Sequence, residues 1–404
     1  MQDLNSENSE KTRACIYDIQ LPEERHGEIV KRVEECESLV KTYGGKVIHK
    51  TIQRRHHAAT RTFIGHHKLE SLVALACEEK ANLIILNREL KPGQIYNIEF
   101  YLEKNKLQKQ IRIWDRLDLI IAIFSRHAKS SEAKLQLELA KIEHFGPRIY
   151  GMGEELSQQS AGIGTRGIGE TNTEIMKRHI AKRKKLLRKK IEKLQSIKKA
   201  NRDRRLKMGF KIVSIIGYTN AGKSQLFQSL TNKNNVVVRN ELFATLDTKI
   251  AHLFLPNTKP SQTVVLCDTI GFIRDLPTNL IDSFHSTLEE TIKSDLLLHV
   301  VDISENDFSA KIKEVEKVLK ILGCDHVPRF FIFNKIDKLS SEDFINSFQA
   351  SKMLSGYNYV FVSAKTGENI VQLREKITFW FFGGQVEKSE ENPSPFLREN
   401  YENH

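Results

Sequence analysis

The chain has 404 residues, of which 40% are apolar and five are cysteines without a CxxC pair. This composition excludes disorder over the whole chain, collagen and a disulfide scaffold, and it predicts two or three globular domains with reduced thiols. No apolar run approaches the roughly 18 residues of a membrane helix, and residues 1–13 lack the apolar core of a secretory signal. We therefore expect a cytoplasmic protein whose first thirteen residues are disordered.

Positive charge is concentrated in one segment of the chain. The sequence has 63 Lys and Arg against 51 Asp and Glu, a net charge of +12. Residues 177–207 contain sixteen Lys and Arg against Glu192 and Asp203 only, which leaves the rest of the chain with a net charge of −2. A basic block without matching acid predicts binding to a phosphate polymer or another anionic surface, the alternative being a solvated helix face.

Residues 14–128 alternate short apolar runs with helical patterns. This alternation predicts an N-terminal α/β domain with mainly parallel strands. Residues 23–43 have apolar positions on one helical face, and two glycines end the pattern. The strand candidates are residues 14–21, 47–52, 82–86 and 111–114.

Residues 129–208 predict a helical hairpin, with helices over residues 131–144 and 173–208. Seven glycines lie within residues 146–170, and Gly146-Pro147 is expected to end the first helix. A functional loop at the tip of the hairpin and a flexible linker are both open for this segment. Apolar residues of the second helix recur every seventh position, which suits packing on one neighbouring helix: Ile180, Leu187 and Leu194.

From residue 209 the pattern predicts a doubly wound α/β domain that extends to residue 385, followed by a polar tail over residues 386–404. Polar residues follow each strand, and in such sheets ligands bind beyond the carboxyl ends of the strands. The strand candidates are residues 212–216, 263–268, 296–302, 330–333 and 359–363.

The first of these strands leads into a phosphate-binding loop (P-loop) with the pattern GxxxxGK[ST], placed between a strand and a helix. Its glycines let backbone N–H groups approach the β-phosphate. Lys223 is expected to bridge the β- and γ-phosphates, and the Ser224 hydroxyl is expected to bind Mg²⁺. The nucleotide-binding residues predicted here are Gly217, Tyr218, Thr219, Asn220, Ala221, Gly222, Lys223 and Ser224.

Three further motifs follow in order, each at a strand end. In Asp268-Thr269-Ile270-Gly271, Asp268 is expected to reach Mg²⁺ through water and the Gly271 N–H to sense the γ-phosphate. In Asn334-Lys335-Ile336-Asp337, a buried Asp337 carboxylate would accept from N1–H and N2–H₂ of guanine, which predicts GTP rather than ATP. Ser363-Ala364-Lys365 is expected to support the guanine O6 through backbone N–H groups.

A threonine between Ser224 and Asp268 is expected to complete the Mg²⁺ shell. The γ-phosphate would then order residues 235–249 and 271–285, which hydrolysis would release. The candidates are Thr231, Thr245, Thr248, Thr258 and Thr263, and Thr245 in Phe243-Ala244-Thr245-Leu246-Asp247 is our choice.

Phe272 follows Gly271, at the position where many Ras-like GTPases carry a water-orienting Gln. An apolar side chain cannot polarise water, so we expect slow unaided turnover and help from a partner or from another group of the chain. Asn220 occupies the loop position that holds a monovalent cation in potassium-dependent GTPases, which makes K⁺ activation a hypothesis. The catalytic residues predicted are Lys223, Thr245 and Gly271.

Two pairs of adjacent histidines raise the question of a zinc site. No cysteine or carboxylate pattern accompanies His56-His57 or His66-His67, and adjacent histidines rarely converge on one metal. We therefore expect a surface or RNA-facing role for them.

Over roughly residues 15–385 the chain resembles the HflX family, ribosome-associated GTPases of the Obg–HflX superfamily. The resemblance implies an N-terminal α/β domain, a basic helical hairpin and a P-loop (Ras-like) GTPase domain, with Thr245 as a Mg²⁺ ligand. It departs from the family pattern at IGHHKL, GIGETNTE and TKIAH. Many members carry a further domain where this chain has only the tail from Gly383, so we expect contacts through that domain to be absent. The segments that carry the resemblance are residues 61–72, 87–99, 114–142, 167–174, 242–247 and 268–277.

The resemblance implies a factor that binds GTP and GDP, hydrolyses GTP, associates with the large ribosomal subunit, and splits or remodels stalled ribosomes. We expect a monomer, because nothing in the sequence demands a dimer. One alternative is a GTP-dependent RNA-binding factor in large-subunit assembly. Another is a regulatory GTPase whose basic helix lies on an anionic membrane, although we expect no stable membrane association. The residues predicted to contact ribosomal RNA are Lys182, Arg183, Lys184, Lys185, Arg188, Lys189 and Lys190.

Overall fold

The computed structural model describes residues 12–159, 172–231, 243, 249–255, 264–269, 271–274, 292–339 and 356–383. The chain divides into two compact units, Met1–Glu192 and Lys193–His404. Helices and strands alternate in both units, so the predicted α/β class is confirmed.

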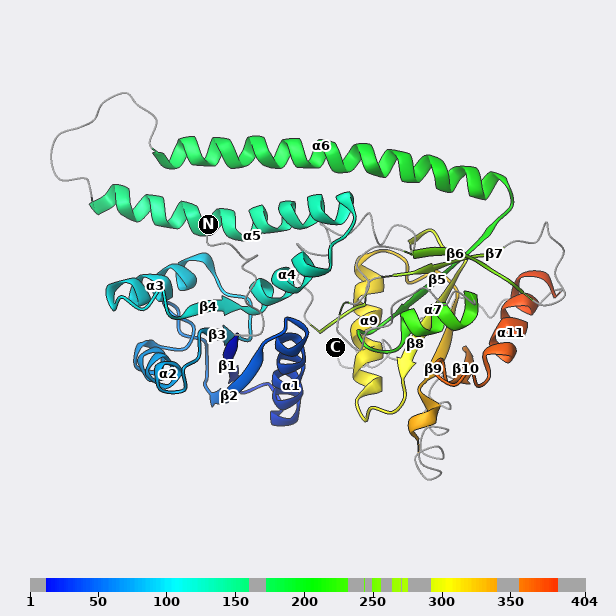
Figure 1. The fold of residues 1–404 in the computed structure, drawn as a ribbon, viewed down its shortest axis with the longest axis horizontal. Helices are drawn as coiled ribbons and strands as arrows, with labels where there is room; N and C mark the ends of the chain where they lie inside the picture. Colours follow the sequence, from blue (N-terminus) through cyan, green and yellow to red (C-terminus); the bar gives the residue numbers. More distant parts are fainter. Residues whose placement is uncertain are drawn as a thin grey trace, which may run out of the picture. The chain divides into compact units, whose positions relative to one another are not determined.

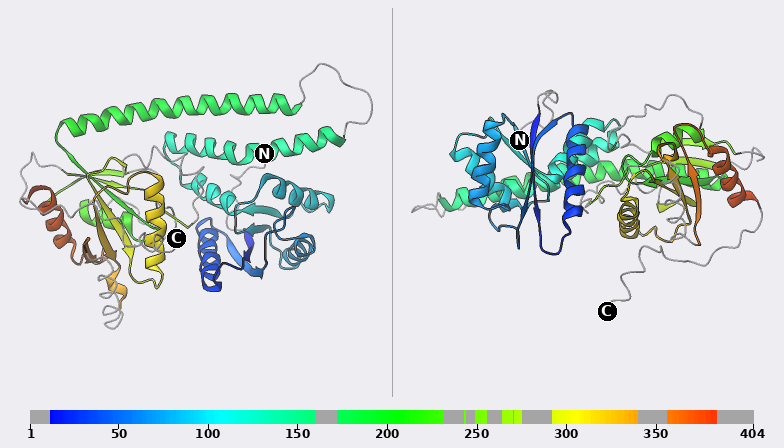
Figure 2. Two further views of the ribbon diagram at one scale, coloured as in Figure 1. Left: turned by 180° about the vertical axis from the view of Figure 1, so that it is seen from behind. Right: turned by 90° about the horizontal axis from the view of Figure 1, so that it is seen from below.

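A four-stranded parallel sheet lies at the centre of the first unit, in the order β2-β1-β3-β4 (Figure 1). Strands β1 and β3 are buried along nearly their whole length, because helices cover both faces of the sheet (Figure 2). α2 and α3 share one apolar core with these strands, through residues such as Leu72 and Ile98. The elements are β1 (Arg13–Gln20), α1 (His26–Thr42), β2 (Lys46–Arg54), α2 (His66–Glu78), β3 (Leu83–Leu86), α3 (Pro92–Lys104), β4 (Arg112–Asp115) and α4 (Arg116–His127).

Two long helices, α5 (Ser131–Gln159) and α6 (Asn172–Lys207), follow this sheet and run side by side (Figure 1). Leu139 and Ile142 of α5 pack with Leu187 and Ile191 of α6, and Ile180 lies at the edge of this cluster. The predicted stripe is therefore present at Ile180 and Leu187, while Leu194 is not part of the cluster.

The prediction that Gly146-Pro147 ends the first helix is wrong, since α5 continues to Gln159. A proline inside a helix removes one backbone hydrogen bond, so it needs packing elsewhere to be tolerated. Gly146, the residue before Pro147, is buried, and a Cβ added there would lie 3.8 Å from Ile180 Cγ2 of α6, an ordinary contact distance. The predicted loop over residues 146–170 is thus helical as far as residue 159, and residues 160–171 lie outside the described part.

The described residues of the second unit form a six-stranded sheet in the order β10-β9-β8-β5-β7-β6, in which β6 is antiparallel to β7 and the other pairs are parallel. Strands β7, β8 and β9 are buried throughout, and α7 and α11 share an apolar core with the sheet. The elements are β5 (Lys211–Gly217), α7 (Lys223–Thr231), β6 (Lys249–Leu253), β7 (Val264–Asp268), β8 (Leu296–Asp302), α9 (Phe308–Ile321), β9 (Arg329–Asn334), a short 3₁₀ helix (Ile336–Lys338), β10 (Asn358–Val362) and α11 (Ile370–Phe382).

The parallel strands of this sheet bring their carboxyl ends to one edge. Gly217, Asp268, Asn334 and Val362 end β5, β7, β9 and β10 there, so the four predicted motifs begin at the same edge. Within the described residues, no helix combines the length and the low polarity that crossing a membrane requires.

Candidate nucleotide-binding site

The loop between β5 and α7 lies very close to neighbouring atoms at two glycines. Gly217 has φ of 144° and Gly222 has φ of 94°. A Cβ at Gly217 would lie 2.3 Å from the Val300 carbonyl oxygen, and one at Gly222 would lie 2.1 Å from Asn334 Nδ2. Only glycine fits these positions, because both the backbone conformation and the space exclude a side chain.

Lys223 is the buried cation of this loop. Its Nζ donates to the Tyr218 carbonyl at 2.7 Å. Burial lowers the pKa of Lys223 to about 8; the Asp268 carboxylate opposes this shift and the Lys335 charge adds to it. A Cβ at Gly271 would lie 2.9 Å from Lys223 Nζ and 2.8 Å from Thr219 Cγ2, so the backbone of Gly271 faces the lysine directly.

Two oxygen-bearing side chains meet beside Lys223. The Ser224 hydroxyl donates to Asp268 Oδ2 at 2.9 Å, and Asp268 is completely buried at the end of β7. A hydroxyl and a carboxylate are the oxygen ligands that Mg²⁺ prefers, so this donor pair fits the expected ion.

Of the threonine candidates for the Mg²⁺ shell, only Thr231 belongs to the described residues. It is buried in α7, where its hydroxyl donates to the Phe227 carbonyl at 2.7 Å. Thr231 is therefore engaged inside its own helix. The other candidates (Thr245, Thr248, Thr258 and Thr263) lie outside the described residues, as do Ala244, Leu246, Asp247 and Ile270, whereas Phe243 is described and buried.

Asn334 connects the P-loop to the loop after β10. Its Nδ2 donates to the Ala221 carbonyl and its Oδ1 accepts from the Ala364 N–H, both at 2.9 Å. Lys335 has φ of 71° and its Nζ lies 2.5 Å from Asp302 Oδ2. These contacts join three of the four predicted motifs into one connected site.

Asp337 accepts a hydrogen bond from the Ser363 hydroxyl at 2.6 Å, so the structure brings these two predicted residues together. The expectation of a buried carboxylate is wrong, because Asp337 is exposed. It lies in a short 3₁₀ helix that follows the end of β9. Ile336 is half-buried and Lys365 is exposed.

Phe272 turns away from the phosphate-binding groups into the core. Its side chain is 1% exposed and belongs to an apolar cluster with Tyr218, Leu297 and Val315. A ring held in this way cannot orient water, which agrees with the expectation drawn from its position after Gly271.

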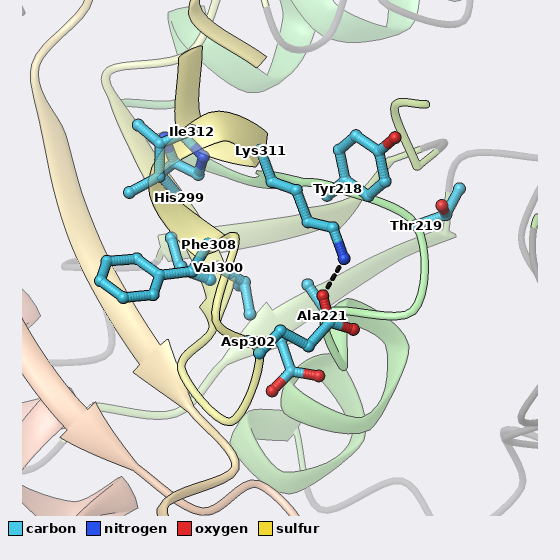
Figure 3. A pocket seen from close by; sticks show the side chains of 11 residues that line it. Tyr218, Thr219, Ala221, His299, Val300, Asp302, Phe308, Lys311 and Ile312 are labelled. Carbon is cyan, nitrogen blue, oxygen red and sulfur yellow. Dashed lines mark hydrogen bonds and ion pairs between the residues drawn. The ribbon is translucent and has the colours of Figure 1, made fainter. Parts of the chain in front are cut away.

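A small recess lies next to the P-loop (Figure 3). Its walls are the loop residues Tyr218, Thr219 and Ala221, the end of β8, and the start of α9. In Figure 3 the Lys311 side chain extends along the same side as Tyr218, and its Nζ forms an ion pair with Glu305.

Comparison with known proteins decides the family. The chain matches the family models described as "GTP-binding GTPase N-terminal" over residues 30–125, "GTP-binding GTPase Middle Region" over residues 127–205 and "50S ribosome-binding GTPase" over residues 212–335. A GTPase HflX from Caldanaerobacter subterraneus subsp. tengcongensis is 43% identical over 307 residues, which cover 76% of this chain and 69% of that protein. The chain belongs to the HflX family of GTPases.

Other HflX GTPases are similar over even more of the chain. The one from Flavobacterium psychrophilum is 35% identical and covers 92% of this chain and 90% of its own length, and the one from Escherichia coli is 34% identical and covers 86% and 78%. A crystal structure of a GTP-binding protein from Sulfolobus solfataricus in complex with GDP is 25% identical, covers 91% of this chain and 97% of that one, and has a TM-score of 0.46. The resemblance seen in the sequence is confirmed: this HflX-family protein binds guanine nucleotide and hydrolyses GTP.

The basic side of the HflX hairpin divides into two sets of residues. Arg183 pairs with Glu138 of α5 at 2.5 Å, and Arg188 pairs with Glu143 at 2.8 Å. Lys184, half-buried, is 3.9 Å from Glu143. Four other predicted RNA-binding residues are exposed and have no ion pair to another described residue: Lys182, Lys185, Lys189 and Lys190.

Two clusters of histidines and carboxylates are not predicted by the sequence. Glu70 Oε1 lies 3.3 Å from His66 Nδ1, and Glu70 Oε2 lies 3.4 Å from His67 Nδ1. We expected no carboxylate beside this histidine pair, and that expectation is wrong. All three side chains are exposed on the first turn of α2. The second cluster joins His144 of α5 to the two aspartates at the start of α4, with Nε2 2.9 Å from Asp118 and 3.5 Å from Asp115. The first cluster depends on which side chains share one face of α2. The second depends on the packing of α5 against α4, which the sequence does not give.

Proposed function

We propose that guanine nucleotide binds across the carboxyl ends of β5, β7, β9 and β10. The observation that carries this assignment is Asn334, which holds the P-loop at Ala221 and the loop after β10 at Ala364. Phosphates would meet Lys223 and the P-loop N–H groups, and the base would meet Asp337 and Ala364.

Ser224 and Asp268 are the described residues that would hold Mg²⁺, with Thr245 as the further ligand that the family resemblance implies. When bound, Mg²⁺ neutralises charge that develops on the phosphates during hydrolysis. Lys223 would supply a second positive charge to the same oxygens, and Gly271, which has no room for a Cβ beside Lys223, would offer them its backbone N–H.

Since Phe272 is buried, we propose that unaided hydrolysis is slow and that the ribosome or a monovalent cation supplies the missing help. Asn220 is exposed in the P-loop with φ of 62°, which leaves its side chain free of the core for a K⁺ ion. Equal rates of hydrolysis in Na⁺ and K⁺ buffers would rule out the cation.

The partner that we propose is the large ribosomal subunit, bound through the four exposed lysines of α6. The match to a family described as 50S ribosome-binding GTPase supports this partner, and the lysines supply charges that are not neutralised by α5. In its GTP state the protein would bind and separate stalled ribosomes, and hydrolysis would release it.

The test measures GTP hydrolysis alone and with purified large subunits, using a variant in which Lys182, Lys185, Lys189 and Lys190 are changed to Glu. We expect large subunits to stimulate hydrolysis by the unchanged protein. The variant should bind large subunits more weakly, and its binding should depend less on the salt concentration. A matched control changes four exposed lysines elsewhere in the first unit: Lys104, Lys106, Lys109 and Lys129. Equal stimulation of both variants would contradict the α6 contact.

Sedimentation of whole ribosomes separates the finer alternatives. Splitting predicts that the GTP-bound protein diminishes the peak of joined subunits, whereas a role in large-subunit assembly leaves that peak intact. Binding to anionic vesicles that exceeds binding to ribosomes would favour the membrane alternative instead.

A further inference from the structure

Tyr218, the second residue of the P-loop, reaches a residue far along the chain. The backbone N–H of Arg274 donates to the Tyr218 hydroxyl at 2.7 Å. Arg274 lies three residues after Gly271, at the start of the segment that is expected to respond to the γ-phosphate. A side chain of the P-loop therefore holds the backbone of that segment directly.

The same two segments also pair through their backbones. The Thr219 N–H donates to the Phe272 carbonyl at 2.7 Å, and the Phe272 N–H donates to the Gly217 carbonyl at 3.2 Å. These two bonds need no particular side chain. The Tyr218 hydroxyl is the part of the connection that depends on the amino acid at this position.

The ring of Tyr218 is itself firmly held. It is 7% exposed and shares an apolar cluster with Phe272 and residues of α9. Lys311 Nζ lies 5.2 Å from the ring centre, a cation–π distance, and Figure 3 shows the two side chains next to each other. Because these contacts hold the ring, the position of the hydroxyl is set by the packing of Tyr218 and does not depend on Arg274.

The held Tyr218 hydroxyl also affects the position of Gly271. Between the paired Phe272 and the end of β7, Gly271 faces Lys223 and Thr219 with no room for a Cβ. Because Gly271 directly precedes residues 272–274, holding those residues in place also holds the Gly271 backbone beside Lys223. The segment is thus positioned in advance, and GTP need not order it on binding.

We infer that the Tyr218 hydroxyl is a positioning group that anchors residues 271–274 beside Lys223 and so favours GTP over GDP. This inference rests on the proposed nucleotide site. Tyr218 does not touch the reacting atoms in this account; it acts through Gly271. GDP has no γ-phosphate for Gly271 to contact, so its affinity should not depend on the hydroxyl.

The test is Tyr218→Phe, which removes the hydroxyl and leaves the ring in its cluster. Equilibrium affinities for GDP and for the non-hydrolysable analogue GMPPNP are measured with Mg²⁺ present. We expect the affinity for GMPPNP to fall about fivefold, the factor that one hydrogen bond of average net strength provides, while the affinity for GDP is unchanged. Single-turnover hydrolysis should slow by a similar factor.

The matched control is Tyr17→Phe, which removes a buried hydroxyl that donates to Gln53 in the first unit. A purely structural role of Tyr218 would lower both affinities together or neither, so the ratio of the two affinities distinguishes the cases. An unchanged ratio, or a ratio that shifts toward GMPPNP, overturns the inference. Lys223→Ala tests the nucleotide site itself. If this variant still binds GMPPNP, the proposed nucleotide site is wrong. If it loses GMPPNP binding but Tyr218→Phe leaves the ratio of the two affinities unchanged, only the role of the Tyr218 hydroxyl is wrong.

Discussion

The two sheets of this protein resemble each other in construction but differ at their carboxyl edges. In the first unit, Asp18 at the end of β1 is completely buried and accepts from Arg32 at 2.8 and 2.9 Å and from Asn87 at 2.8 Å. Asn87 in turn accepts from Arg116 at 2.9 Å. The charged and amide side chains at this edge therefore form hydrogen bonds with one another.

At the same edge of the second sheet, close-packed glycines accompany side-chain contacts such as those of Asn334 and Lys335. Gly217, Gly222 and Gly271 leave no room for a Cβ there, and Gly271 brings its backbone next to Lys223. In both units the carboxyl ends of parallel strands meet at one edge of the sheet. The residues of the loops at this edge decide whether ion pairs close it or a ligand can bind there.

The largest effect is expected from Lys223→Ala, which removes the positive charge from the second edge. Loss of one group that stabilises developing charge lowers turnover by about 100- to 1,000-fold, so GTP hydrolysis should fall below detection in a standard phosphate-release assay. The first sheet should keep its unfolding midpoint. Hydrolysis at the original rate would mean that the phosphates bind elsewhere.

Arg32→Met should break the closed edge of the first sheet. The change leaves Asp18 buried without its main partner, which is expected to lower the free energy of unfolding by about 3–5 kcal/mol. Urea unfolding measures the effect, with Lys50→Met as the control, because the Lys50–Glu37 pair at 2.8 Å is exposed and is expected to contribute less than about 1 kcal/mol. Equal losses in the two variants would show that burial of the pair is unimportant.

Asp337→Asn sharpens the assignment of the second edge to guanine. The amide cannot accept from both N1–H and N2–H₂, so the affinity for GTP should fall by about 100-fold and xanthosine triphosphate should become the better ligand. Competition between the two nucleotides measures this change. Continued preference for GTP would place the base away from Asp337.

The smallest effect concerns His144, which joins α5 to the start of α4 within the first unit. Burial by itself lowers the pKa of His144, but hydrogen bonds and charges from Asp115 and Asp118 outweigh it and raise the pKa to about 9. A raised folded-state pKa stabilises the protein fully below pH 6.5, and this contribution disappears as the pH rises through 9. His144→Gln should therefore cost about 2 kcal/mol at pH 6 and almost nothing at pH 10.

Unfolding midpoints of the unchanged protein and of His144→Gln at pH 6, 8 and 10 provide the measurement. A difference that stays constant over this range would show that the charge on His144 makes no contribution.

Much of the second sheet could be predicted from the sequence. The P-loop and the residues 268–271, 334–337 and 363–365 are contiguous motifs that each follow an apolar strand, so their placement at one edge follows from strand order and parallel pairing. The family resemblance was visible for the same reason: it depends on runs of adjacent residues.

What the sequence alone determined is therefore local: the α/β class, the nucleotide motifs and the basic face of α6. Only the tertiary structure decided that α5 passes through Pro147, that Asp337 is exposed, and that Tyr218 meets Arg274. The same is true of the ion pairs that occupy Arg183 and Arg188. These features join residues that are distant in the chain, and such contacts arise from packing and desolvation, which short-range spacing and propensity do not encode.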